Sequence, residues 1–539
     1  MAIAAKHNKN LRPAKHSRSD QQSQFSLGSY KFSFVLTALL FLLSFTSRIQ
    51  GNETLVLSFR GAAFALLLWQ SHLMYLAFRA KETRVFSIVL RPQHYIQAMV
   101  QSSVYLYWGY YWQPVYEHGW LIIAQLLFAY TFDMLLAWSR RREYTLGFGP
   151  IPIIFSINLF LWFRDDWFYL QFLMIAVGFM GKEYVRWQRE GRSVHIFNPS
   201  AFALGLFSLI LIITNTTHLT WGHEIASTLT LAPGIYTFLF LIGLVVMYFF
   251  SITLVAGVSA ISLFALSALY YQTAGVPYFL DSEIPAAVFL GLHLLVTDPS
   301  TSPRTPLGKT LFGLLYGLGV FALYTILDNL GAPTFYDKLL CVPLLNLSVI
   351  AIDRAVRSIK SETILNLWNQ NWFKGRANLA HMGIWMAVFL GMSLIGKTDG
   401  KHTGDSLPFW AQSCSAGLPN ACGRLLQLKE TYCGDNSAWA CNELGAHYKE
   451  GKITEIDTGL SLAYFERACE LKYQLACFNL LDQNLLGRGD PQELDLRLLL
   501  REGGQNLMNT PLSELYARAC EHEWSFACSM TQVANGTRL

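Results

Sequence analysis

Charged residues are scarce in this sequence. Of its 539 residues only 14% are Asp, Glu, Lys or Arg, against about 25% in an ordinary soluble domain. This scarcity excludes a soluble enzyme or a disordered scaffold as a description of the whole chain. The formal net charge of +5 is small, so no basic surface for nucleic acid is expected. The sequence also lacks a Walker loop, a dinucleotide-binding glycine fingerprint and a nucleophile elbow.

Cysteine is almost missing from residues 1–396, which hold only Cys341, and we expect that residue to be a small apolar core residue. The other eight cysteines lie in 397–539. That tail has 13 basic and 18 acidic residues, whereas residues 1–396 have 28 basic and 18 acidic ones. The chain therefore divides near residue 397 into a membrane domain and a soluble appendage.

Long apolar runs fill the first part of the chain. A membrane-spanning helix needs ~20 mostly apolar residues, and we count thirteen candidate stretches, which predict an all-α polytopic bundle. The segment 284–297 is short enough to be a half-helix. The thirteen approximate ranges are 32–48, 54–78, 95–115, 119–138, 146–163, 166–182, 199–215, 232–251, 252–271, 284–297, 308–328, 337–353 and 378–396.

Basic residues orient these stretches, because cytoplasmic loops of membrane proteins are rich in Lys and Arg. The arm 1–31 is basic, and we expect it to stay in the cytoplasm rather than to act as a signal peptide. Alternate loops hold the remaining basic clusters, and the opposite loops hold only Arg48, Arg164 and Lys338. This pattern predicts an odd number of spans across a bacterial inner membrane. The tail 397–539 is then periplasmic.

The cysteines of the tail form four C-x7-C pairs. Two cysteines eight residues apart in one helix are separated by about 12 Å, and a disulfide tolerates at most ~7 Å between Cα atoms. Each bridge therefore needs a turn between two helices, and it implies an oxidising compartment. The alternative, zinc binding, is less compatible because zinc sites use closer cysteine spacing. The predicted disulfides are Cys414–Cys422, Cys433–Cys441, Cys469–Cys477 and Cys520–Cys528.

The segments Asn442–Gly451 and Ala463–Cys469 resemble the cysteine-rich branch of the Sel1-like repeat family. The resemblance covers 413–535, with an insertion around 486–512. It implies a disulfide-linked, TPR-like helical repeat. Repeats of this kind bind other proteins through a curved surface, so a periplasmic or membrane protein partner is expected from the fold alone.

Two Pro-containing motifs interrupt the apolar sequence. Asn198 and Asp298 each precede a proline, as N-cap residues do. We interpret both motifs as helix N-termini, which favour anionic groups, and paired helix breaks often mark a membrane site. The alternative is that these residues only cap helices. The predicted site residues are His195, Asn198, Pro199, Thr297, Asp298, Pro299, Thr301 and Ser302.

The same motifs, together with Gly313, Asn346 and the Ile352-Asp353-Arg354 segment, resemble the NqrB/RnfD family over roughly 90–355. The family includes membrane subunits of electron-transport complexes. The resemblance implies two inverted five-helix bundles that bind flavin, here FMN or riboflavin held non-covalently. Covalent FMN is not expected, because the loop with Thr228 and Thr230 lacks the Gly-Ala-Thr motif.

The segment Arg91–Gln97 is similar to the opening of a stand-alone, UnbU-like branch of that family. The function expected from these resemblances is flavin-dependent electron transfer across the membrane, with the periplasmic repeat docking a partner. A small-solute or ion transporter or channel is the first alternative, and a membrane-anchored interaction platform is the second. The predicted parts are an arm 1–31, extra helices 32–90, a core 91–355, a loop and last helix 356–396, and a repeat domain 397–539.

Overall fold

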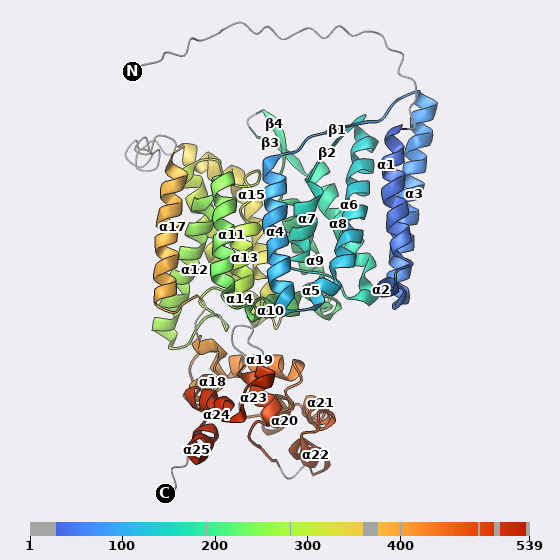
Figure 1. The fold of residues 1–539 in the computed structure, drawn as a ribbon. Coiled ribbons are helices and arrows are strands. Elements are labelled where there is room, and N and C mark those ends of the chain that lie inside the picture. Colours follow the sequence, from blue (N-terminus) through green and yellow to red (C-terminus); the bar gives the residue numbers. More distant parts are fainter. Residues whose placement is uncertain are drawn as a thin grey trace.

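The computed structural model describes residues 28–189, 191–280, 282–358, 376–398, 402–482, 486–500 and 507–534. Long helices run side by side in a bundle, and the shorter C-terminal helices gather at one end of it (Figure 1). The predicted division into a helical bundle and a helical appendage is confirmed. Residues 1–27 of the predicted basic arm, and 359–375 of the predicted loop, lie outside the described residues.

The bundle is formed by helices from both halves of the membrane domain. The first half contains α1 (Gly28–Leu43), α2 (Ser47–Gln50), α3 (Glu53–Ala80), α4 (Pro92–Tyr111), α5 (Pro114–Glu117), α6 (Gly119–Arg140), α7 (Pro150–Asn158), α8 (Tyr169–Tyr184) and α9 (Pro199–Ile213). The second half contains α10 (Gly222–Thr228), α11 (Ile235–Phe250), α12 (Thr253–Ala274), α13 (Ala286–Leu294), α14 (Pro306–Asn329), α15 (Asp337–Ser358) and α17 (Ala377–Leu394).

The prediction of thirteen complete spans is wrong. Within the described residues, six helices are long and apolar enough to cross a membrane, or seven if the bent pair Gly222–Leu231 and Ile235–Phe250 is one span. Several other predicted stretches hold helices that are too short, such as α7 and α13 with nine residues each. The non-helical segment 159–163 that follows α7 is buried. Such backbone is tolerated at membrane depth where protein rather than lipid covers it, and the apolar runs do not reveal those breaks.

The outer helices present apolar side chains on their exposed faces. Leu57 and Phe64 of α3 are 61% and 60% exposed, and Leu390 of α17 is 58% exposed. Only 17% of the 18-residue apolar stretch of α17 is buried inside the protein. A surface of this kind is stable against lipid rather than water. The chain is therefore a multi-pass membrane protein that contacts the bilayer.

Two small sheets lie at the end of the bundle opposite the appendage (Figure 1). Strand β1 (Val85–Ile88) pairs in parallel with β2 (Glu143–Leu146). Strands β3 (Arg186–Arg189) and β4 (Arg192–His195) form an antiparallel hairpin. The hairpin leads directly into α9, so it sets the position of His195 beside the start of that helix.

The appendage consists of short helices joined by tight turns. They are α18 (Leu407–Ser415), α19 (Ala421–Gly434), α20 (Ala438–Glu450), α21 (Thr458–Glu470), α22 (Gln474–Leu481), α23 (Glu493–Leu499), α24 (Leu512–Glu521) and α25 (Ser525–Ala534). All four predicted disulfides are present, each joining two consecutive helices with Cα atoms 4.6 to 4.8 Å apart. Both the pairing and the need for a turn inside each pair are confirmed.

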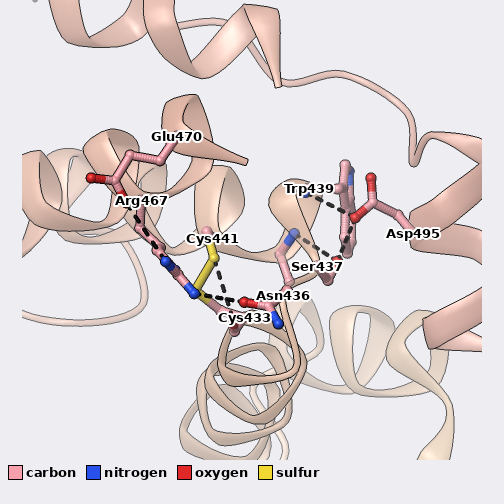
Figure 2. The surroundings of a disulfide bond; sticks show 9 residues. Cys433, Asn436, Ser437, Trp439, Cys441, Arg467, Glu470 and Asp495 are labelled. Atoms are coloured by element: carbon pink, nitrogen blue, oxygen red, sulfur yellow. Dashed lines mark hydrogen bonds and ion pairs between the residues drawn. A yellow bond between two sulfur atoms is a disulfide. The ribbon is translucent and has the colours of Figure 1, made fainter. Parts of the chain in front are cut away.

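Figure 2 shows how one of these turns is held, between α19 and α20. Its Cys433–Cys441 disulfide is buried. Asn436 has a positive φ of 71° and accepts a hydrogen bond from Arg467 of the next helix pair, 2.6 Å away. Ser437 caps α20 and donates to the Asp495 carboxylate at 2.8 Å. Neighbouring helix pairs are thus linked by polar contacts as well as by packing.

Candidate functional sites at the two ends of the bundle

The first predicted motif is a helix start, as the sequence indicated. The side-chain Oδ1 of Asn198 accepts from the backbone N–H groups of Ser200 and Ala201, at 3.1 and 3.4 Å. Its Nδ2 donates to the Leu295 carbonyl at 3.1 Å, and its backbone N–H donates to Asn346 Oδ1 at 3.1 Å. The side chain of Asn198 therefore caps α9 and also binds the segment that follows α13.

The second predicted motif is not a helix start. Helix α14 begins at Pro306 and is capped by Thr305, whose Oγ1 accepts from the Gly308 N–H at 3.0 Å. Asp298 lies before this point and makes a local turn, accepting from the N–H and the hydroxyl of Ser300 at 2.9 and 2.6 Å. Pro299 and Pro303 lie between Asp298 and the helix, and each proline disfavours α conformation in the residue before it. A helix follows only the third proline, Pro306.

The two motifs nevertheless lie side by side. Asn346 of α15 donates to the Thr301 carbonyl at 3.3 Å, so it contacts both motifs. Arg189 of β3 donates to the Ser302 carbonyl at 3.0 Å and forms a 2.7 Å ion pair with Asp353 of α15. The Arg189 and Asp353 side chains are only 6% and 9% exposed. Sequence reasoning did not single out Arg189, because only the hairpin fold brings it to this point.

Most of the predicted site side chains have partners within their own segments. The Thr297 hydroxyl donates to the His293 carbonyl at 2.6 Å, and the Ser302 hydroxyl donates to the Asp298 carbonyl at 2.8 Å. Pro199 is buried at the start of α9 and offers no donor. The two motifs, together with Arg189, Asn346 and Asp353 that bind them, connect the two halves of the bundle. We call this group of residues the inner clasp. The Thr297 and Ser302 hydroxyls are thus already bound within the protein.

Only the edge of the inner clasp is accessible. His195 Nε2 lies 2.9 Å from the Ser300 hydroxyl and 3.9 Å from an Asp298 carboxylate oxygen. Burial opposes ionisation of Asp298, but the contacts with His195 and Ser300 outweigh it and hold the pKa of this carboxyl below its ordinary value. An ionised carboxylate therefore stands beside an imidazole here. Pro299 is exposed in the same turn.

Other polar residues of the bundle also have structural partners. The Asp133 carboxylate accepts from the Tyr144 hydroxyl at 3.2 Å and lies 3.6 Å from Lys182 Nζ. His293 is 1% exposed, with Nδ1 2.8 Å from the Phe289 carbonyl. Cys341 is the free cysteine among the described residues, and it is buried. Asp133 is thus paired inside the bundle.

A cavity of about 800 Å³ lies at the other end of the bundle, where the appendage meets it. We call it the outer cavity. Its floor is α10 together with the loop between α14 and α15, and its roof is one face of α19. The residues that line it are Trp112, Trp221, His223, Glu224, Ser227, Thr228, Asp328, Gly331, Ala332, Pro333, Asn420, Gly423, Arg424, Gln427, Glu430, Thr431, Gly434 and Asp435.

Aromatic rings stack from the wall of the outer cavity into the bundle. Trp112 lies parallel to Trp162, with ring centroids 5.9 Å apart and an interplanar angle of 7°. Trp162 stacks on His118 at 4.0 Å. Beyond it, His118 Nε2 lies 3.0 Å from the Asn158 amide oxygen, and Asn158 donates to Gln125 at 2.6 Å. A buried polar network therefore sits behind the aromatic wall.

Sequence reasoning missed the outer cavity. The aromatic run at 105–112 was its visible signal, because Trp112 lines the cavity, but such a run is also typical of an interfacial belt. Tyr110, 70% exposed, fits that belt, whereas Trp108 is fully buried and donates to the Thr228 hydroxyl at 3.3 Å. The roof depends on how α19 docks on the bundle, and the sequence of α19 alone does not show that contact.

The described residues hold no group of three or more His, Cys, Asp or Glu side chains suited to a metal ion. Comparisons of the chain with protein-family models, with curated proteins and with solved structures found no match. The resemblances to the NqrB/RnfD and Sel1-like families therefore stay predictions from motifs.

Proposed function

We propose that this chain is a membrane-embedded protein that binds a small solute. Such binding is the step that the transporter function, the first alternative expected from the sequence, requires. The observation that carries the proposal is the outer cavity, which is bounded by both the bundle and the disulfide-linked appendage. Its volume of about 800 Å³ falls in the range of about 300–1,000 Å³ found for small-molecule sites. The appendage then serves as a lid on the bundle.

Two glycines offer a sharp test of this proposal. Gly423 of α19 lines the outer cavity, and a Cβ placed there would meet no atom within 4 Å. Gly383 of α17 is equally free of contacts but lies far along the chain on an exposed face of another helix. Gly423→Trp should fill the cavity without disturbing α19, and Gly383→Trp is its matched control.

The measurement is mass spectrometry of small molecules that remain bound to the full-length protein after purification from its native membrane. We expect a compound that wild type and Gly383→Trp retain and that Gly423→Trp has lost. Either the absence of any retained compound or equal retention in both variants contradicts the proposal.

We also propose the orientation that the basic loops and the disulfides favour, with the appendage in the periplasm. Arg192 lies in the exposed turn of the hairpin, and Glu466 is exposed on α21 of the appendage. A membrane-impermeant maleimide added to intact cells with a permeabilised outer membrane should label a Glu466→Cys variant. It should leave Arg192→Cys unlabelled until the inner membrane is opened. The reverse pattern contradicts this orientation.

Flavin-dependent electron transfer is the second candidate function. The stack from Trp112 through Trp162 to His118 favours it, because it brings aromatic rings from the cavity wall into the bundle. A periplasmic partner docked on the repeat domain belongs to the same proposal. The test is the visible spectrum of the purified full-length protein together with extraction of FMN or riboflavin. Protein that is colourless and yields no flavin argues against this candidate.

A further inference from the structure

We propose that the parallel sheet β1–β2, at the end of the bundle opposite the appendage, forms a site for the headgroup of an anionic phospholipid. The inference goes beyond the outer cavity and does not depend on it. Strand β1 crosses from the end of α3 to the start of α4, where the long helices end (Figure 1). We call the segments 79–91 and 140–148, which contain both strands, the sheet patch.

One face of the sheet patch is anchored on the bundle. Trp138 of α6 is fully buried, and its Nε1–H donates to the Val85 carbonyl at 3.3 Å. Tyr144 of β2 is also buried. Gly147 allows the two segments to approach closely, because a Cβ there would lie 2.5 Å from the Val89 carbonyl oxygen. The position of the sheet patch over the end of α6 is therefore fixed.

The sheet patch exposes neighbouring aliphatic side chains in and directly after β1. Ile88 is 67% exposed and Leu90 is 61% exposed, and Val85 and Val89 are exposed as well. Water is an unfavourable surrounding for such a group of apolar side chains. At the boundary between headgroups and acyl chains, the same side chains gain contact with lipid. A phospholipid therefore covers them without any need for a protein partner.

Basic residues surround these aliphatic side chains. The sheet patch contains seven basic and two acidic residues, and Glu183 of α8 adds a third carboxylate through its ion pairs with the patch. Seven basic against three acidic residues leave an excess of four positive charges, with every ion pair already counted. The seven basic residues are Arg79, Lys81, Arg84, Arg91, Arg140, Arg141 and Arg142.

The carboxylates beside the sheet patch are shared between arginines. Glu82 pairs with Arg84 at 3.1 Å and with Arg142 at 2.6 Å. Glu183 pairs with Arg141 at 3.0 Å and lies 3.7 Å from a second arginine of the same run. One carboxylate neutralises one arginine, so each group keeps a positive charge. The Arg142 side chain is 67% exposed, which leaves guanidinium N–H donors accessible to a phosphate oxygen.

An anionic phospholipid matches both properties of the sheet patch. Its phosphate diester binds guanidinium groups, and its acyl chains contact the aliphatic side chains. Clusters of basic residues at a membrane surface favour anionic lipids in this way. A zwitterionic lipid offers the same chains without a net charge, and a free phosphate offers the charge without the chains. Both should therefore bind more weakly.

The test titrates full-length protein in a neutral detergent with phosphatidylglycerol or with phosphatidylcholine of identical acyl chains. Native mass spectrometry counts the bound lipid. We expect phosphatidylglycerol to bind about tenfold or more tightly, because several basic residues act on its charge. Equal binding of the two lipids overturns the inference. Displacement of phosphatidylglycerol by an equal concentration of soluble glycerol phosphate assigns the site to a free anion, and this also overturns it.

Two double variants with the same loss of charge separate a local site from the general positive charge of this end of the bundle. Arg91→Gln with Arg142→Gln removes two exposed cations from the sheet patch, and Arg192→Gln with Arg354→Gln removes two exposed cations outside it. The first pair should weaken binding of phosphatidylglycerol by about tenfold and leave phosphatidylcholine unchanged. The second pair should change binding less than about twofold. Equal effects of the two pairs overturn the inference.

Photo-crosslinking in native membranes reports what covers the aliphatic side chains. The full-length protein carries p-benzoylphenylalanine in place of Ile88, or in place of Leu390 on the exposed face of α17 as the control. After irradiation, mass spectrometry should show the mass of one phospholipid added at position 88, with anionic lipids enriched relative to position 390. An adduct of the size of a protein at position 88, or the same lipid composition at both positions, overturns the inference.

Discussion

Arg424 of the appendage forms a two-point ion pair with Asp328 at the end of α14, with both N–O distances at 3.2 Å. Its guanidinium carbon also lies 5.0 Å from the centroid of the Tyr324 ring. The Arg424 side chain is 7% exposed and that of Asp328 is 29% exposed, so the arginine is largely removed from water and the carboxylate is partly so. Beside it, the buried side chains of Trp410 and Val276 join the appendage to the bundle in one apolar cluster. The roof of the outer cavity is fixed by this contact.

The variant Arg424→Gln should loosen the appendage from the bundle. Breaking this partly buried pair leaves Asp328 without its cation, and we expect a loss of about 1–2 kcal/mol in docking free energy. Hydrogen–deuterium exchange in nanodiscs should show faster exchange along α19. The control is Arg518→Gln, which removes a partly exposed pair with Glu514 inside α24. Equal exchange of α19 in both variants would show that the ion pair does not hold the roof.

Removing the disulfide between Cys433 and Cys441 should destabilise the appendage. Closing a loop of this length stabilises a protein by roughly 2–3 kcal/mol through the entropy of the unfolded chain, and both sulfurs are buried beside Leu444 and Phe465. The Cys433→Ala, Cys441→Ala double variant should therefore unfold at a lower temperature by circular dichroism. The matched control removes Cys520 and Cys528, which are less buried, and should cost less. The opposite order of melting temperatures would contradict this prediction.

The pattern of the sequence was sufficient for the coarse architecture. Apolar runs identified a membrane bundle, and the C-x7-C spacing identified each helix–turn–helix bridge, because both are local properties of the chain. The number of complete spans was not accessible in the same way. Helices α7 and α13 end after nine residues because neighbouring helices cover the broken backbone, and that cover is a tertiary property.

The candidate sites show the same difference between local properties, which the sequence reveals, and tertiary properties, which it does not. Asn198 was identified as a cap because a cap is a local structure, and its contact with Leu295 was in keeping with the prediction that the two motifs meet. Asp298 was assigned wrongly because a run of prolines offered several helix starts, and only packing selected Pro306. The outer cavity needs α19 placed on α10 and α14, so no single segment of the sequence contains its signal.

The appendage should lose stability in acid through His447. Burial, followed by the charges of Lys429 and Arg488, lowers the pKa of this imidazole from 6.5 to about 2. The unfolded chain therefore binds a proton below about pH 6.5 that the folded chain does not bind, so stability falls as the pH drops. The slope from this one group approaches about 1.4 kcal/mol per pH unit. Between pH 7.5 and 4.5 the melting temperature should depend less on pH for His447→Asn than for wild type. An equal pH dependence in both proteins would contradict the prediction.

The variant Asn198→Ala distinguishes a structural contact from a ligand site at the inner clasp. Asn198→Ala removes the cap of α9 and the hydrogen bonds to Leu295, and it leaves a buried carbonyl without its donor. We expect a loss of about 2–4 kcal/mol, since a lost cap costs about 1 kcal/mol and an unsatisfied buried group costs about 1–3 kcal/mol. Thr305→Ala, which removes only the cap of α14, should cost about 1 kcal/mol.

Unfolding in mixed detergent micelles measures both losses, and mass spectrometry of the small molecules retained by the purified protein provides the second readout. Helices α10 and α19, which border the outer cavity, lie at the end of the bundle opposite the β3–β4 hairpin (Figure 1). Asn198→Ala should therefore leave the retained compound bound while it lowers stability. If Asn198→Ala instead removes the retained compound and leaves stability at the wild-type value, the clasp is not structural. The site predicted from the two Pro-containing motifs would then replace the outer cavity as the place where this protein acts.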